Sequence, residues 1–233
     1  MKQIFDNDLQ DYKLNVDFNK LLGDWCEPLK DMLGNKLMGV LMFFVNNIYE
    51  RSLNTVYPLK KDLFKAFKLC KFKDVQVVIV NCSNEFMNSK SNGLAFGNKD
   101  ELINNFFDSS LITLFNNIEM KDYDGLMIDK DFTLESWAKK GVLLLNSSLT
   151  SYSSLSHTFQ WYNFISFLLK KISSEKQGII FVVIGEQPNT LYSNKINDKK
   201  HTLIRYKTFD YNVLEDINSN IEEINGKNYR IKW

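Results

Sequence analysis

The chain alternates between short runs of apolar residues and longer segments in which apolar residues recur every three or four positions. The clearest short run is 75–80, where five of the six residues are valine or isoleucine and a polar stretch follows abruptly at Asn81. A run with hardly any polar alternation predicts a central β-strand that is covered on both faces. The longer segments, such as 37–49, predict amphipathic helices.

The same patterns predict the rest of the framework. Strands are expected at 178–184 and 201–206, and another strand, ending at Asn146, follows Gly141, which caps a predicted helix. Further helices are expected at 62–69, 99–107, 112–120, 161–172 and 213–224, and a last strand-like segment at 229–233. This alternation predicts an α/β fold, a three-layer α/β/α sandwich with a central, mostly parallel four-stranded sheet. We expect one domain at 23–233, preceded by a polar arm at 1–22.

The end of the strand at 75–80 is the expected place of a binding site. In an open α/β sheet, ligands lie in the crevice outside the carboxyl ends of the strands. The polar residues that follow Asn81 stand at such an end. We therefore expect the ligand of this protein close to residues 82–86.

Composition and charge limit the partners. A length of 233 residues with 44% hydrophobic and 14% aromatic residues is typical of a globular domain. Most proteins that bind duplex DNA along its backbone carry a clear excess of basic residues, whereas the net charge here is +1. Any nucleic-acid role therefore depends on local basic patches. The densest basic cluster indicates either a solvated helix face or a contact with phosphates, and it consists of Lys60, Lys61, Lys65, Lys68, Lys71 and Lys73.

Several classes of protein are not supported by the sequence. No apolar run reaches the roughly 20 residues of a membrane span, and the first residues do not resemble a signal peptide. Three cysteines without a CxxC spacing favour reduced thiols and a cytoplasmic location. We expect no metal and no cofactor, because two histidines lack partnered ligands and no phosphate-binding glycine motif is present. Abundant Asn, Lys, Ile and Phe with 3 prolines suggest an AT-rich genome, such as that of a phage or mobile element.

Four motifs, in one consistent order over 23–233, resemble uracil-DNA glycosylases of the Ung type (family 1). The family pattern YPxxxxxFxAF is matched from Tyr57 to Phe67, and the pattern HGLxFS is matched by 93–96. The pattern LxxWAxQGVLLLN resembles 134–146, and SHxxxGW resembles 156–161 with slight shortening. The resemblance implies the uracil-DNA glycosylase fold.

The catalytic motifs of the family are degenerate here. The hexapeptide GQDPYH reads Asn-Cys-Ser-Asn-Glu-Phe at 81–86, so Ser83 replaces the carboxylate that handles water and the cationic transition state. Lys207 stands where the family motif HPSPLS has its catalytic histidine, and Tyr211 stands where it has the leucine that intrudes into the duplex. The resemblance therefore leaves no assigned catalytic residue, with Glu85 as the one alternative acid.

Part of the base pocket resembles that of the family. Phe96 matches the phenylalanine that stacks on uracil, and Asn146 matches the asparagine that reads the uracil edge; the alternatives are an ordinary core aromatic and a buried strand-end cap. The expected pocket residues are Cys82, Glu85, Phe86, Phe96 and Asn146. The expected DNA contacts are Ser110, Glu186, Lys207, Phe209, Tyr211, Lys60, Lys61 and Lys65, although Glu186 replaces a phosphate-contacting serine of the family.

These observations favour a catalytically inactive homologue, a pseudoenzyme that serves as a binding module in replication or repair of a phage or mobile element. Its partner is expected to be single- or double-stranded DNA, with Phe209 and Tyr211 stacking on bases, or a replication or repair protein. No membrane partner is expected. One alternative is a glycosylase of altered specificity that uses Glu85. Another is a decoy for glycosylase inhibitor proteins.

Overall fold

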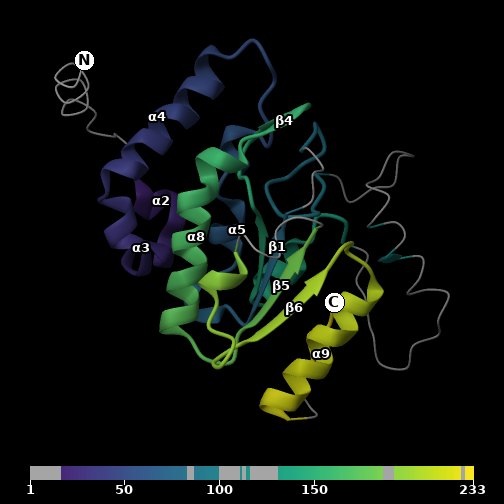
Figure 1. The fold of residues 1–233 in the computed structure, drawn as a ribbon. Coiled ribbons are helices and arrows are strands. Elements are labelled where there is room, and N and C mark those ends of the chain that lie inside the picture. The colour runs from purple at the N-terminus through teal and green to yellow at the C-terminus, as the bar shows by residue number, and fades with distance from the viewer. Residues whose placement is uncertain are drawn as a thin grey trace.

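Figure 1 shows the computed structural model of the chain, which describes residues 17–82, 87–99, 111, 114–115, 131–185, 192–226 and 229–233. A four-stranded sheet contains β1 (Val77–Asn81), β2 (Val142–Asn146), β5 (Ile180–Ile184) and β6 (Thr202–Tyr206). The strand order is β2-β1-β5-β6, and all neighbouring pairs are parallel. The predicted α/β fold with a parallel four-stranded sheet is confirmed.

Helices cover both faces of the sheet, which gives three layers (Figure 1). On one side lie α2 (Phe18–Leu22), α3 (Cys26–Leu33), α4 (Lys36–Arg51) and α8 (Thr158–Glu175), and on the other side lies α9 (Tyr211–Asn225). The shorter elements are η1 (Gly23–Trp25), η2 (Lys60–Asp62), α5 (Lys65–Leu69), η3 (Phe72–Asp74), α7 (Glu135–Lys139), η4 (Ser193–Lys195) and the antiparallel pair β3 (Ser151–Tyr152) and β4 (Leu155–Ser156).

The apolar strands form the centre of the core. Every residue of β2 and β5 is buried, and so are the first four residues of β1, because helices cover both sides of these strands. The four tryptophans are fully buried around the sheet, and Trp25 donates a hydrogen bond from Nε1 to the carbonyl of Cys70 at 2.8 Å. Of the arm predicted at 1–22, the structure describes residues 17–22. These residues include helix α2, which places Leu22 in the core.

Two local predictions were wrong. The helix expected at 62–69 begins at Lys65, because Lys60–Asp62 form a 3-10 turn first. The segment 229–233 is not a strand: the side chain of Asn218 accepts from the Ile231 N–H at 2.9 Å and donates to the Ile231 carbonyl at 3.1 Å, in place of a neighbouring strand. Most of the helices expected at 99–107 and 112–120 lie outside the described residues.

A buried polar cluster joins α8 to the loop after β2. Trp161 donates from Nε1 to Oγ1 of Thr150 at 2.7 Å, and Nδ1 of His157 lies 3.0 Å from the same oxygen. The Thr150 hydroxyl can therefore donate its own hydrogen to a neutral His157. Burial of the ring lowers the pKa of His157, and a hydrogen bond with Thr150 only partly opposes this effect.

This lowered pKa predicts a loss of stability at acidic pH. Below the usual histidine pKa of about 6.5, the unfolded chain binds a proton that the folded chain does not bind, so unfolding becomes more favourable as pH falls toward the lowered value. We expect the free energy of unfolding, measured by urea unfolding, to fall as the pH is lowered from about 7.5 to about 5.5. The substitution His157→Gln should flatten this dependence. An unchanged slope in the variant would assign the pH dependence to other groups.

Candidate functional site

The carboxyl ends of β1 and β2 lie side by side and carry the first candidate residues. In the parallel register, Asn81 lies opposite Asn146. The carbonyl of Asn81 accepts from the Ser147 N–H at 2.8 Å, and the Asn81 side chain donates from Nδ2 to Oδ1 of Asn146 at 3.2 Å. The Cys82 N–H is fixed in turn by the carbonyl of Ile184 at 2.8 Å. This is the sheet edge at which the strand pattern places a ligand.

Asn146 is buried, with 9% of its surface exposed, and both polar atoms of its side chain face other parts of the chain. Its Oδ1 accepts from Asn81, and its Nδ2 lies 3.9 Å from Sδ of Met87, a weak acceptor. A base edge that paired with Asn146 would have to replace these contacts. The contact with Met87 is the weaker of the two.

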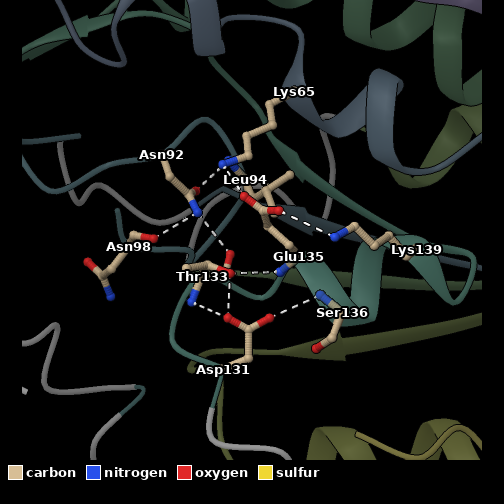
Figure 2. Close-up of polar contacts among 9 residues, drawn as sticks. All are labelled: Lys65, Asn92, Leu94, Asn98, Asp131, Thr133, Glu135, Ser136 and Lys139. Carbon is tan, nitrogen blue, oxygen red and sulfur yellow. Dashed lines mark hydrogen bonds and ion pairs between the residues drawn. The ribbon is translucent and has the colours of Figure 1, made fainter. Parts of the chain in front are cut away.

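The loop that contains Phe96 is held in place by the buried amide of Asn92, whose contacts Figure 2 shows. Asn92 is 1% exposed and donates from Nδ2 to the carbonyls of Asn98 and Thr133, each at 2.8 Å, while its Oδ1 accepts from the Leu94 N–H at 3.0 Å. These three bonds fix the loop around Phe96, whose φ of 64° is a left-handed conformation that such a residue rarely adopts. Tertiary contacts thus impose the position of Phe96.

Behind this loop, two carboxylates organise the start of α7 (Figure 2). Asp131 accepts from the backbone N–H groups of Thr133 at 2.9 Å and Ser136 at 3.0 Å. Burial disfavours the ionised form of Asp131, but hydrogen bonds from Thr133 and Ser136 outweigh it and hold the pKa below its usual value. Glu135 has a lowered pKa mainly because of its hydrogen bond with Lys65, whose Nζ lies 2.7 Å from Oε1.

The ring of Phe96 is stacked on Phe209, with ring centroids 4.4 Å apart and an angle of 17° between the planes. Phe209 is 3% exposed and also meets Trp137 edge to face at 6.3 Å. One face of Phe96 is therefore covered by a side chain from the loop after β6. The sequence predicted both aromatic residues as site residues but not their contact with each other.

The other predicted site residues are placed as follows. Tyr211, at the start of α9, is 6% exposed and therefore buried, like Phe209. Either side chain would have to leave its buried position before it could stack on a base. Lys207 is exposed just after β6. Lys60 and Lys61 are exposed, and Lys60 lies 3.6 Å from Glu50. The remaining predicted residues lie outside the described part of the chain, so their roles stay predictions. They are Ser83 at the catalytic position, Glu85, Phe86, Ser110 and Glu186.

Cys82 is half-buried at the end of β1 and carries a neutral thiol. Burial raises its pKa to about 12, against the opposing effect of a hydrogen bond with Ser147. A thiol in this state is not a nucleophile at neutral pH, because the thiolate is the reactive form.

Across the part of the chain that the structure describes, no group of acidic, cysteine or histidine side chains is arranged to hold a metal ion. No described helix is both long and apolar enough to cross a membrane.

Two site residues were missed by the sequence analysis, Asn92 and Met87. Asn92 stands directly before Gly93, at the position of the histidine in the family pattern HGLxFS. An Asn-Gly pair is a loop signal, which could have drawn attention to it. No sequence signal indicates Met87, because its contact with Asn146 joins residues that are far apart in the sequence.

Comparison with known proteins identifies the family. No protein-family model matches the sequence. The uracil-DNA glycosylase of Mycoplasmopsis pulmonis is 30% identical over 203 residues, which are 82% of this chain and 87% of that protein. The uracil-DNA glycosylase of Aliarcobacter butzleri is 30% identical over 183 residues, covering 77% and 82% of the two chains.

Solved structures show the same fold. The crystal structure of mimivirus uracil-DNA glycosylase superimposes with a TM-score of 0.74 at 20% identity, covering 97% of this chain and 92% of that chain. A variant of the mimivirus protein, solved in complex with UGI, has a TM-score of 0.75 at 18% identity, covering 96% and 92%. The order of motifs, the sheet and the relatives that span most of both chains agree: the chain belongs to the uracil-DNA glycosylase family.

Proposed function

We propose that this member of the family has lost uracil excision and serves as a binding module for DNA or for a protein of replication or repair, in a phage or mobile element. The observation that carries the proposal is the state of the two retained recognition side chains. Phe96 is stacked on Phe209, and Asn146 is bonded to Asn81 and faces Met87. Both side chains are thus already in contact with other residues of this chain at the atoms that would bind a base.

The residues at the two catalytic positions support the same proposal. Ser83 offers a neutral hydroxyl in place of a carboxylate, and Lys207 offers a compact cation in place of an oriented imidazole. Removing one electrostatic group of this kind commonly costs about 2.7–4 kcal/mol of transition-state stabilisation. If the two losses add, excision slows by about 10⁴-fold or more.

The test is uracil excision from single- and double-stranded DNA at high protein excess. The Mycoplasmopsis pulmonis relative serves as the reference, and Glu85→Ala and Lys207→Ala are assayed beside the unaltered chain. We expect no release by the unaltered chain over long incubation. Release that disappears in Glu85→Ala would overturn the proposal and establish a glycosylase with a rebuilt acid.

Binding is then measured by mobility shift with the same DNA at increasing salt. Retention that weakens with salt supports a DNA-binding module, since release of counterions accompanies contact with phosphates. Failure to bind DNA, together with specific binding of a replication or repair protein, supports a protein-binding module. Tight binding of UGI alone would favour the decoy alternative instead.

A further inference from the structure

The lysine cluster between residues 60 and 73 is divided by the fold into two parts. In the first part, Lys60 and Lys65 have acidic partners, Glu50 at 3.6 Å and Glu135 at 2.7 Å. The second part lies around a surface hollow of about 390 Å³ and is joined there by a lysine from α2. The four lysines that line the hollow are Lys20, Lys68, Lys71 and Lys73.

The hollow has an excess of positive charge. All four lysines are exposed, and none forms an ion pair with another residue in the described part of the chain. Asp24 is the acid among the lining residues, and its two carboxylate oxygens accept from the N–H groups of Phe72 at 3.1 Å and Lys73 at 3.4 Å. Outside the lining residues, a fifth cation and a second acid offset each other: Nζ of Lys176 donates to the carbonyl of Lys73 at 3.0 Å, and Asp74 acts electrostatically on the same ammonium group.

We propose that this hollow binds the phosphate backbone of a nucleic-acid strand. Four ammonium groups on flexible stems are point charges that suit a row of repeated phosphates. A site for one free phosphate usually adds converging backbone N–H groups, and here those of Phe72 and Lys73 are already held by Asp24. The buried floor of Leu22 and Phe67 shapes the hollow but leaves no aromatic face open for a base.

The position of the hollow separates it from the candidate base pocket. Lys71 and Lys73 precede the first residue of β1, whereas Asn81 and Cys82 stand at the opposite end of that strand. A strand of five residues is about 16 Å long. A nucleic-acid strand held here need not enter the pocket near Phe96. The proposal is therefore independent of whether uracil is excised.

The experiment compares two triple variants of the full chain. Lys68→Ala/Lys71→Ala/Lys73→Ala alters the hollow, and the matched control alters three lysines that line a different hollow of about 460 Å³, Lys170, Lys195 and Lys200. Affinity for a fluorescent duplex without uracil is measured by anisotropy at several salt concentrations. We expect the first variant to weaken binding and to reduce the slope of log K against log salt by about 2–3, at about 0.9 per phosphate contact. The control should change neither quantity.

The same assay can overturn the proposal in three ways. Equal losses in both variants would reveal a general effect of net charge, and an unchanged slope in the first variant would exclude the hollow. Displacement of the duplex by inorganic phosphate, beyond the effect of chloride at equal ionic strength, would assign a site for free phosphate. Circular dichroism of both variants checks that the fold is retained.

Discussion

Replacing Phe209 by alanine is expected to lower the free energy of unfolding by about 3–5 kcal/mol, the usual cost of removing a buried aromatic side chain. Phe209 is 3% exposed and fills the space between Phe96 and Trp137. Urea unfolding measures the change. Phe159→Ala is the matched control, because Phe159 is 89% exposed, and we expect a change within about 0.5 kcal/mol there.

The same substitution tests how Phe209 affects the candidate pocket. With Phe209 removed, one face of Phe96 is uncovered, and stacking of one base on an aromatic ring is worth about 1–3 kcal/mol. We expect the folded variant to bind a single-stranded oligonucleotide more tightly than the unaltered chain does, and to a similar extent with uracil or thymine at the exposed position, because stacking tolerates any base. Equal affinities of the variant and the unaltered chain would show that Phe209 does not control access to Phe96.

Replacing Asn92 by alanine is expected to destabilise the protein by about 3 kcal/mol. Its side chain makes three buried hydrogen bonds, each worth about 1 kcal/mol net, and two carbonyls and one N–H lose a partner when it is removed. Urea unfolding again gives the free energy. Asn212, which is exposed, provides the control Asn212→Ala, with an expected change within about 0.5 kcal/mol.

A local readout separates loosening of the Phe96 loop from a general loss of stability. The Leu94 N–H donates to Asn92, so its hydrogen exchange should accelerate more in Asn92→Ala than exchange in β5. A loss of stability below about 1 kcal/mol, with unchanged exchange at Leu94, would contradict the role of Asn92 in holding this loop.

The sequence by itself determined the sheet and the family. The runs that became β1 and β5 are apolar at nearly every position, because a parallel strand covered on both faces has no exposed side to carry polar residues. The motifs between Tyr57 and Trp161 then placed Phe96 and Asn146 as candidate site residues. The same local reasoning failed at 229–233, where a side chain of α9 rather than a neighbouring strand bonds the backbone.

Only the tertiary structure decided which partners the candidate residues have. Phe96 and Phe209 are far apart in sequence and meet because parallel strands bring their following loops to one edge of the sheet. The lysine cluster is divided into two surfaces because acids from other segments lie close to Lys60 and Lys65, whereas among the described residues none forms an ion pair with Lys68. The burial of a strand can be predicted from the pattern of apolar residues along the strand itself. Aromatic stacking and ion pairing cannot, because they depend on side chains that folding brings together from distant parts of the chain.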